Sequence, residues 1–482
     1  MIIPRHIVAE LFSKTTHEYP EEIDRLPASG SDRIYFRLKS RGKSLIGAFN
    51  PVIQENRAFI SLTRQFTDIH LPVPQIIAIN ESQNAYLLED LGDTTLYAIV
   101  EQERRSNAVW NERLTQYYQQ ALDDLLLFQN TVGQGLDLSE AWPRKAFDRQ
   151  SILWDLNYFK YYFVRITGTD FDEDRLEDDF QRFAAFLASC HSDFFMYRDF
   201  QSRNIMMHND KQYYIDYQGG RRGPLQYDTA SLLYDAKANI PDETRKTLLE
   251  YYLRKAISLH MTTEESFMKW WPSFIFIRIM QALGAYGYRG FFQQKQHFLL
   301  SVPYALRNLE NLLKEYGLPR GYPELHAVFE KIVSNEYLLS FGAQRERLKV
   351  SVMSFSYRKG LPADTSGNGG GFIFDCRALP NPGREERFKS LTGNHPDVVQ
   401  YLDQSAEVAD FYENCKNLVI QSITNYLQRG FTHLMVCFGC TGGQHRSVYM
   451  ASKLARHLKT LEGFETELIH RELSSPEQVI VD

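Results

Sequence analysis

The stretch Tyr197-Arg198-Asp199-Phe200-Gln201-Ser202-Arg203-Asn204 decides how most of this 482-residue chain is interpreted. An apolar and aromatic run follows it and ends in Ile215-Asp216-Tyr217-Gln218. An aspartate, an asparagine five residues on and a second aspartate twelve residues further are the order in which a phosphoryl-transfer site presents a base and two metal ligands. The pattern therefore predicts transfer of a phosphoryl group.

Each polar residue of this pattern has a chemical reason to be there. Asp199 would accept the proton of the attacking hydroxyl group, and we assign Arg198, beside it, to the same catalytic loop. Asn204 and Asp216 would hold Mg²⁺ next to the phosphates of ATP, because oxygen ligands suit this hard cation. The alternative is a polar loop beside a hairpin, in which these side chains serve turn chemistry.

The flanking segments predict two lobes around this loop. Residues 1–95 form a sheet-rich lobe, with strands at Ile34–Leu38 and Ser44–Phe49, a helix over Glu55–Phe66 and a last strand and hinge over Ala85–Gly92. From residue 96 to 340 helical periodicity dominates. The most hydrophobic stretch, Trp270–Tyr288, contains a proline and an arginine, so we interpret it as a buried helix and not a membrane span.

Two parts of the first lobe are candidates for holding the nucleotide. Ser29, Gly30 and Ser31, with Arg33 before the first strand, would offer backbone N–H groups to phosphates, although a plain turn explains them equally well. Glu89 and Leu91 lie at the expected hinge, where backbone groups would face adenine; the alternative is an ordinary strand end.

Taken together, residues 1–335 resemble the aminoglycoside phosphotransferase-like family, and more narrowly its bacterial sugar 1-kinases, which phosphorylate N-acetylmuramate and N-acetylglucosamine at the anomeric position. The resemblance implies an α+β, protein-kinase-like two-lobed fold, ATP and Mg²⁺, and a sugar substrate. The segments that carry it are Ser31–Arg37, Leu88–Asp93, Tyr197–Asn204, Gly223–Asp228 and Gln281–Gly287.

One departure from the kinase pattern concerns a lysine. The strand Ser44–Phe49 lacks the lysine that kinases place there, so Arg37 or Lys43 would have to substitute for it. The missing lysine leaves a pseudokinase open as an alternative. For the substrate, Trp154 and Asp155 would meet a sugar, but the apolar spacing of Arg149–Phe159 favours an amphipathic helix into which Trp154 simply packs.

The pattern changes near residue 345, and residues 348–482 predict a compact α/β domain. Strands are expected at Lys349–Phe355, Phe372–Asp375 and Leu434–Phe438, with a helix over residues 447–459. Between the last strand and this helix lies a loop of small residues, which would collect backbone N–H groups at the helix N-terminus and bind an oxyanion. The phosphate-binding candidates are Cys440, Thr441, Gly442, Gly443, His445, Arg446 and Ser447.

Other interpretations of this loop stay open. One alternative is a tight turn that packs the helix against the strand. Another is a phosphatase loop, because the spacing of Cys440 and Arg446 matches that of thiolate phosphatases. A redox pair of Cys437 and Cys440 is a third alternative. Cys437 falls inside an apolar strand, however, which favours a buried structural cysteine.

Residues 348–473 resemble the C-terminal domain of the RapZ RNase adapter family. The matching segments are Phe374–Pro382, Leu391–Gly393 and Gly439–Tyr449. The resemblance implies binding of a phosphorylated amino sugar and, in some members, of a small RNA. From Lys349 to Asp482 there are 14 Lys/Arg and 15 Asp/Glu, a net charge of −1, which gives RNA little support.

Composition fits packed domains in a reducing compartment. Hydrophobic residues make up 43% and aromatic residues 13% of the chain, and its net charge is −6. Five irregularly spaced cysteines argue against a disulfide framework, and the N-terminus has no apolar signal core, so we expect a cytoplasmic protein.

The motifs and the two resemblances together favour an ATP-dependent amino-sugar kinase joined to a phosphosugar-binding domain. The alternative is a kinase-like adapter that binds hexosamine phosphate together with RNA or a protein partner.

Overall fold

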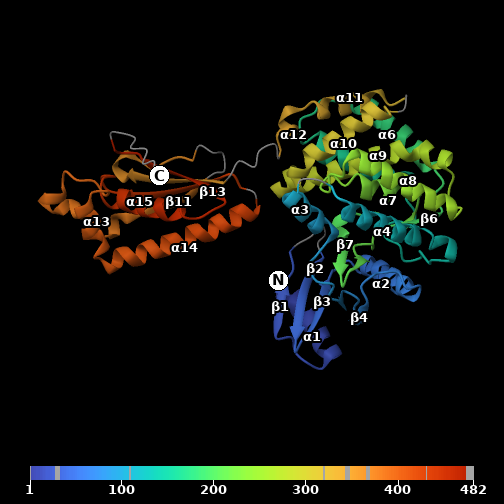
Figure 1. Ribbon diagram of the computed structural model, residues 1–482, viewed down its shortest axis with the longest axis horizontal. Coiled ribbons are helices and arrows are strands. Elements are labelled where there is room, and N and C mark those ends of the chain that lie inside the picture. Colours follow the sequence, from blue (N-terminus) through green and yellow to red (C-terminus); the bar gives the residue numbers. More distant parts are fainter. Residues whose placement is uncertain are drawn as a thin grey trace. The chain divides into compact units, whose positions relative to one another are not determined.

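The structure is a computed structural model, and it describes residues 2–27, 33–107, 110–318, 321–341, 348–364, 370–429 and 431–473. The chain divides into two compact units, Met1–Phe341 and Gly342–Asp482, each with its own hydrophobic core (Figure 1).

A five-stranded antiparallel sheet opens the first unit. Its strands lie in the order β1 (Glu22–Arg25), β2 (Ile34–Ser40), β3 (Lys43–Phe49), β5 (Ala85–Glu89) and β4 (Ile76–Ile79). Helix α1 (Ile2–Thr16) packs on one face and α2 (Ile53–Asp68) on the other (Figure 1). Alternating side chains explain this: Leu87 packs with the α1 cluster, whereas its neighbours Tyr86 and Leu88 pack with the α2 cluster.

The rest of the first unit is helical. Its helices are α3 (Leu96–Asn107), α4 (Glu112–Gln129), α5 (Arg149–Phe159), α6 (Glu173–Ala188), α7 (Leu225–Leu233), α8 (Asp242–Ser258), α9 (Glu264–Gly287), α10 (Val302–Glu315), α11 (Pro323–Val333) and α12 (Glu336–Ser340). Two small antiparallel ribbons are inserted among them. They pair β6 (Phe194–Met196) with β9 (Arg221–Gly223), and β7 (Ile205–His208) with β8 (Lys211–Tyr214). These ribbons carry the Tyr197–Asn204 loop and Asp216.

Helix α9 is the centre of this helical part. Most of its side chains are buried, as predicted for the stretch from Trp270, and Pro272 lies within the helix. It packs against α5, α7 and α10. Among the described residues, the helices are all too short or too polar to cross a membrane.

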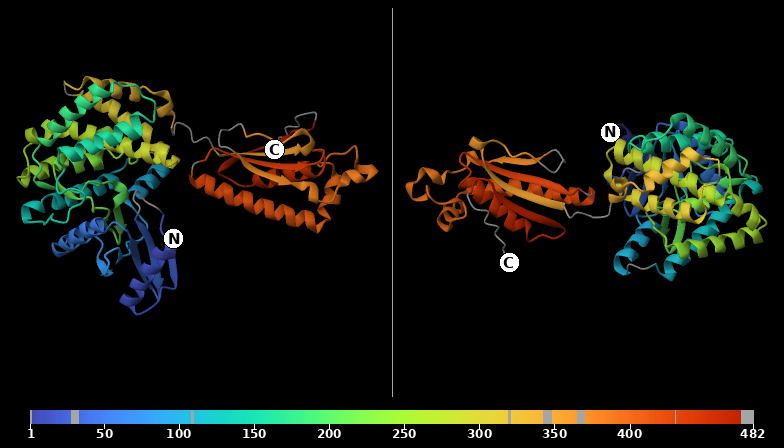
Figure 2. Two further views of the ribbon diagram at one scale, coloured as in Figure 1. Left: turned by 180° about the vertical axis from the view of Figure 1, so that it is seen from behind. Right: turned by 90° about the horizontal axis from the view of Figure 1, so that it is seen from above.

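The second unit is a parallel four-stranded sheet with helices. The strands lie in the order β11 (Gly371–Asp375), β12 (His433–Cys440), β10 (Leu348–Ser356) and β13 (Phe464–His470). Helices α14 (Ala406–Arg429) and α15 (Arg446–Leu458) share the main core with this sheet, and α13 (Pro396–Asp403) packs on α14 (Figures 1 and 2). Because parallel strands end at the same edge, the ends of β10 and β12 lie side by side at the loop that leads into α15.

Candidate active site and anion-binding loop

A buried carboxylate holds the Tyr197–Asn204 loop in place. Asp228, in the first turn of α7, accepts hydrogen bonds from the backbone N–H groups of Tyr197 (2.6 Å) and Arg198 (2.9 Å). Burial raises the pKa of Asp228 to about 7, although the two N–H groups act in the opposite direction. The loop is therefore fixed through its backbone, at the residues just before Asp199.

Arg198 turns away from this loop toward helix α5. Its guanidinium forms two hydrogen bonds with Asp155, of 2.8 and 2.5 Å, and lies over the rings of Phe147 and Tyr227. Its backbone is left-handed, with φ of 85°. Arg198 and Asp155 thus form a partly buried fork-type ion pair that joins the loop to α5. The same pair occupies Asp155, the carboxylate considered for sugar binding.

Tyr197 connects the loop to the second aspartate. Its ring is fully buried, and its hydroxyl donates a 2.7 Å hydrogen bond to the carbonyl of Ile215, the residue before Asp216. The two halves of the sequence pattern are therefore joined directly, although they lie on different ribbons.

Asp199, Asn204 and Asp216 lie together. The Asn204 side-chain amide donates to the backbone carbonyl of Asp199 (2.8 Å) and lies 3.5 Å from Asp216 Oδ2. Gln218 donates to the other Asp216 oxygen (2.8 Å), and the Asp216 backbone is left-handed, with φ of 71°. Burial, and then the negative charge of Asp199, raise the pKa of Asp216.

These residues fit a divalent cation. The Asn204 amide nitrogen is engaged by the Asp199 carbonyl, so its Oδ1 would serve as the ligand, and Asp216 would supply carboxylate oxygens. Burial is the largest cause of the raised pKa of Asp216, and the negative charge of Asp199, which a cation would neutralise, adds to it. Mg²⁺ usually takes only one or two protein ligands and completes its shell with phosphate and water. Accordingly, among the described residues no cluster of three or more His, Cys, Asp or Glu side chains that could hold a metal ion is present.

The predicted nucleotide residues are only partly described. Ser29, Gly30 and Ser31 lie outside the described residues. Arg33 is buried before β2, next to α2. Glu89 ends β5, and the Leu91 carbonyl accepts a hydrogen bond from the His208 ring on β7 (3.2 Å). The predicted hinge thus touches the ribbon that follows Asn204.

A small polar pocket opens beside Asp199. Its lining includes charged and amide side chains from the loop, from the segment after α7 and from α9: Asp199, Arg203, Asp235, Lys237, Arg278 and Gln281. Its volume is about 40 Å³, so a bound sugar would extend out of it. Of the segment considered for the substrate, Trp154 does not line this pocket. The prediction that Trp154 packs inside was also wrong, because 45% of its surface is exposed.

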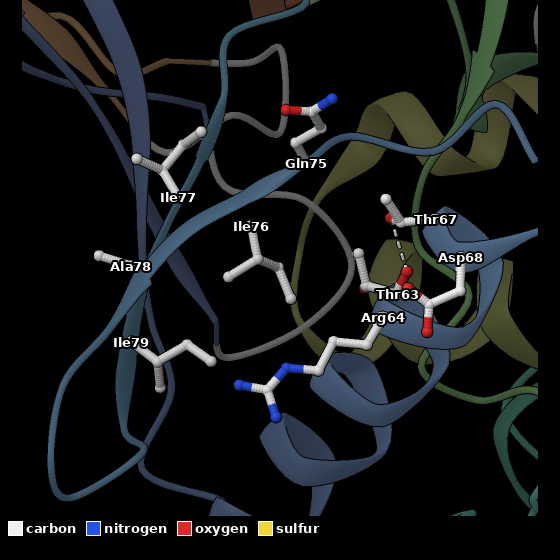
Figure 3. Close-up of a pocket in the computed structure, with 9 residues that line it drawn as sticks. All are labelled: Thr63, Arg64, Thr67, Asp68, Gln75, Ile76, Ile77, Ala78 and Ile79. Carbon is white, nitrogen blue, oxygen red and sulfur yellow. Dashed lines mark hydrogen bonds between the residues drawn. The ribbon is translucent and has the colours of Figure 1, made fainter. Parts of the chain in front are cut away.

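Larger cavities lie elsewhere in the first unit. One of about 530 Å³ opens between α2 and β4, lined by residues such as Thr63, Arg64 and Ile76 (Figure 3). It includes none of the residues that carry the chemistry above. The candidate site is therefore identified by the polar groups around Asp199 and not by the size of a cavity.

In the second unit, the loop after β12 is tied to its surroundings by side chains. Gln444 donates to the carbonyls of Lys389 and Leu391, and the His445 ring donates to that of Phe388 (2.8 Å). Thr441 and Gly442 are exposed, whereas Gly443, with φ of 72°, is buried. The exposed tip therefore sits on a rigid base at the N-terminus of α15.

Two buried charged groups lie at this loop. The Arg446 Nη1 donates to the carbonyls of Arg377 (2.8 Å) and Leu379 (3.0 Å), while its buried Nε has no hydrogen-bond partner among the described residues. Glu472 packs against Gly443 and forms an ion pair with Lys359 (2.6 Å). Its Oε1 is buried without a hydrogen bond within the described part of the chain, and Arg471 Nε lies 3.9 Å from it. Arg446 was predicted to bind a phosphate; its Nη1 is engaged by the carbonyls of Arg377 and Leu379, whereas its Nε is not.

Cys440 differs from the other cysteines. Burial alone would raise the pKa of its thiol, but Ser447, whose Oγ lies 3.1 Å from Sγ, and the backbone N–H groups of Gly443 and Ser447 lower it below the ordinary value. Burial raises the pKa of Cys190, Cys415 and Cys437 to about 12. A redox pair of Cys437 with Cys440 therefore lacks a second activated thiol.

Two family models match this chain. The model of the Phosphotransferase enzyme family matches residues 22–270, and that of the RapZ C-terminal domain matches residues 348–474. Both predicted resemblances are confirmed at this level, and so is the kinase-like fold class.

Curated relatives match a short part of the chain. A nucleotide-binding protein of Thioalkalivibrio sulfidiphilus is 40% identical over 129 residues, which are 27% of this chain and 43% of that protein. One from Solibacter usitatus is 37% identical over 126 residues, 26% of this chain and 38% of its own length. The chain thus spans less than half the length of these relatives.

Solved structures with similar folds are kinases. Aminoglycoside phosphotransferase APH(4)-Ia, in a ternary complex with ADP and hygromycin B, is 13% identical with a TM-score of 0.43, and the match covers 65% of this chain and 99% of that one. Ethanolamine kinase of Plasmodium vivax is also 13% identical with a TM-score of 0.43, over 60% of this chain and 82% of that one.

The hydrogen bond from Tyr197 to Ile215 leads to a stability prediction. In Tyr197→Phe, the free energy of unfolding should fall by about 1–2 kcal/mol, because the partly buried Ile215 carbonyl loses its partner. Tyr227→Phe is the matched control: Tyr227 is also fully buried, and its hydroxyl has no hydrogen-bond partner in the described structure. Urea denaturation measures both, and equal losses in the two variants would contradict the role given to Tyr197.

The lowered pKa of Cys440 leads to a pH-dependent prediction. Only the thiolate reacts with an alkylating reagent, so Cys440 should be modified at a lower pH than the other four cysteines. Ser447→Ala should move this onset to higher pH, because the thiolate loses a hydrogen bond. Mass spectrometry of peptides after timed alkylation gives the profile for each cysteine. Labelling of Cys440 no earlier than the others would refute the prediction.

Proposed function

Because the chain belongs to the Phosphotransferase enzyme family, we propose that it is a kinase that transfers the γ-phosphoryl group of ATP to a hydroxyl group of an amino sugar, at the anomeric position. The observation that carries this proposal is the convergence of Asp199, Asn204 and Asp216 on a loop that Asp228 fixes. Residues 1–95 and 96–340 would form its two lobes, with the phosphates held between them.

Each residue of the site has a role in this reaction. Asp199 accepts the proton of the attacking hydroxyl group as the new bond to phosphorus forms. Asn204 and Asp216 hold Mg²⁺, which neutralises charge on the phosphates when bound. Arg198 positions the loop through Asp155 and does not contact the substrate. Glu89 and Leu91 would face the adenine; Ser29, Gly30 and Ser31, outside the described residues, stay candidates for binding the phosphates.

The pocket beside Asp199 supports a sugar as acceptor. Asp235, Arg278 and Gln281 offer hydrogen-bond acceptors and donors within one small space, which suits a molecule with several hydroxyl or amide groups. Tyr97 and Tyr286 also line it and provide flat aromatic surfaces for a sugar ring. An amino sugar combines the features that this lining would recognise.

We further propose that residues 348–482 bind a phosphorylated amino sugar. The exposed tip at Thr441 and Gly442, the N-terminus of α15 and the Arg446 Nε would hold the phosphate. Glu472 Oε1, buried against the same loop, would accept a hydrogen bond from the ammonium group. The net charge of −1 over residues 349–482 favours this small ligand over RNA. The five free cysteines support a cytoplasmic location.

The kinase proposal predicts sugar-dependent turnover of ATP. Asp199→Asn and Asp216→Asn should each lower kcat by about 100-fold or more, because the base or a ligand of the metal is lost. A coupled ADP assay over a panel of amino sugars and neutral sugars provides the measurement. Asp210→Asn, an exposed change in the nearby β7–β8 turn, is the control and should leave turnover unchanged. No sugar-dependent turnover in the native protein would sink the kinase proposal and favour the adapter.

The second unit predicts binding of glucosamine-6-phosphate without ATP. Gly442→Asp should abolish binding, because it adds a negative charge where the phosphate is held. Gly442→Asn is the matched control; a Cβ at Gly442 meets no atom within 4 Å, so both variants should fold.

Calorimetry on the full chain also separates the two ends of this ligand. Glu472→Gln should weaken binding of glucosamine-6-phosphate more than that of glucose-6-phosphate, because only the former carries an ammonium group. Equal affinity in Gly442→Asp and Gly442→Asn would refute the phosphate site. Equal weakening of both sugars by Glu472→Gln would refute the amine contact alone.

A further inference from the structure

The pocket beside Asp199 contains a lysine that the proposed reaction leaves unused. Lys237, in the segment after α7, lines this pocket and is half-buried. Its Nζ lies 5.3 Å from the centre of the Phe298 ring and forms no hydrogen bond or ion pair within the described part of the chain. Because burial disfavours an unpaired charge, Lys237 is a candidate for binding an anion.

The main chain at Lys237 is fixed to the catalytic loop. Ser202 of that loop donates to Asp235 Oδ2 (2.8 Å), and Asp235 Oδ1 accepts the backbone N–H of Lys237 (3.2 Å). Arg104 of α3 donates to the Lys237 carbonyl (3.3 Å). Lys237 is thus held in place relative to Asp199, which lies three residues before Ser202.

Two arginines line the same pocket from other elements. Arg203, the residue after Ser202 in the catalytic loop, is exposed and forms no hydrogen bond or ion pair with any described residue. Arg278, on α9, is buried, and its Nε donates to Ser231 (2.9 Å) and its Nη1 to Gln281 (2.7 Å). Its third nitrogen, Nη2, makes no hydrogen bond in the residues that the structure describes. Three cations from three separate elements therefore border one space.

Positive charge exceeds negative charge among the described residues of this lining. Besides the three cations, the lining holds the carboxylates of Asp199 and Asp235. Asp199 is the proposed base, and Asp235 is already bonded to Ser202 and to the backbone of Lys237. Burial, and then the positive charge of Arg203, lower the pKa of Lys237. A bound anion would relieve this repulsion between like charges.

The pocket lies in the helical part and apart from the proposed nucleotide site. Its described lining runs from Tyr97 to Tyr286, so none of it comes from the sheet in residues 1–95, and neither Asn204 nor Asp216 takes part. The phosphates of ATP would lie between the two lobes, beside those two metal ligands. The cations of the pocket are therefore placed for the acceptor.

The size of the pocket fits a phosphate group. Its volume of about 40 Å³ is too small for a sugar ring but holds about three water-sized groups, since one takes roughly 10–15 Å³. A phosphate monoester presents three terminal oxygens and nearly two negative charges at pH 7. A carboxylate has two oxygens and one charge. Lysine and arginine donors on several sides suit the phosphate better.

We propose that the acceptor is an amino sugar that already carries a phosphate, and that Lys237 and Arg203, with Arg278, bind this phosphate. This inference rests on the proposed kinase function and narrows its substrate. The anomeric hydroxyl oxygen of the sugar phosphate attacks the γ-phosphorus of ATP and gives its proton to Asp199. The bond from this phosphorus to the bridging oxygen breaks, ADP leaves with the electron pair, and the sugar leaves as a bisphosphate.

The test compares two acceptors that differ only in the phosphate. All proteins carry Gly442→Asp, which removes the phosphate site proposed for the second unit. In a coupled ADP assay, kcat/KM for glucosamine-6-phosphate should exceed that for glucosamine roughly 10- to 100-fold, because charged hydrogen bonds to the phosphate are gained. Mass spectrometry should find two phosphates on the product.

A lysine variant assigns this preference to the pocket. Lys237→Met should remove most of the preference, through a higher KM for glucosamine-6-phosphate. The variant should fold, because Lys237 has no hydrogen bond or ion pair to lose among the described residues. Lys246→Met, which removes an exposed charge from α8, is the matched control and should keep the preference.

Each outcome bears on one proposal. If no sugar supports turnover, the kinase proposal itself fails. If glucosamine and glucosamine-6-phosphate are turned over equally well, the kinase proposal stands and the phosphate subsite is refuted. Faster turnover of muramic acid, which carries a carboxylate and no phosphate, would also refute it. If Lys237→Met weakens ADP binding in calorimetry as much as it weakens use of the sugar phosphate, the lysine serves the nucleotide and the inference is overturned. Should Lys237→Met fail to fold, the exposed change Arg203→Met decides by the same ratio of kcat/KM values.

Discussion

The active site depends on one buried carboxylate that accepts two backbone N–H groups. Asp228 fixes Tyr197 and Arg198 at their main chain, and this holds Arg198 in a left-handed conformation that an arginine adopts only at a cost of about 1–3 kcal/mol. Every further contact follows from that turn: the Arg198 side chain reaches Asp155, Tyr197 reaches Ile215, and Asp199 faces the pocket. Because Asp228 binds the main chain, this anchor does not depend on the side chain at position 197.

The sequence predicted those features that lie within a few residues of one another. Asp199, Asn204 and Asp216 belong to one short segment, so their spacing alone indicated a common site, and the structure brings them together. The strands at Ile34 and Lys349 and the helix from Arg149 follow from their periodicity. Helix α1 and strands β1, β4 and β13 were not predicted, because short or exposed elements have weak patterns and form only on a sheet that other segments build.

Contacts between distant segments could not be predicted. Arg33 was assigned to a phosphate-binding loop, and nothing in its neighbourhood along the chain indicated Glu55, which approaches from α2. Asp155 was considered as a sugar contact because its partner, Arg198, lies 43 positions away and was not recognised. Glu472 was not among the predicted site residues, because it comes close to Gly443 only when β13 joins the parallel sheet. In each case an ion pair or close packing across the fold decided the role of the charge.

Arg198 and Asp216, at the two ends of the site, each have a left-handed backbone, although neither residue is glycine or asparagine. At position 216, asparagine or glycine would adopt this conformation with less strain, but neither supplies the carboxylate that the reaction uses. Selection for thermal stability alone would therefore draw the sequence toward inert variants. A directed-evolution campaign on this scaffold therefore gains from scoring turnover in every round, because stability gained at position 216 comes at the expense of the reaction.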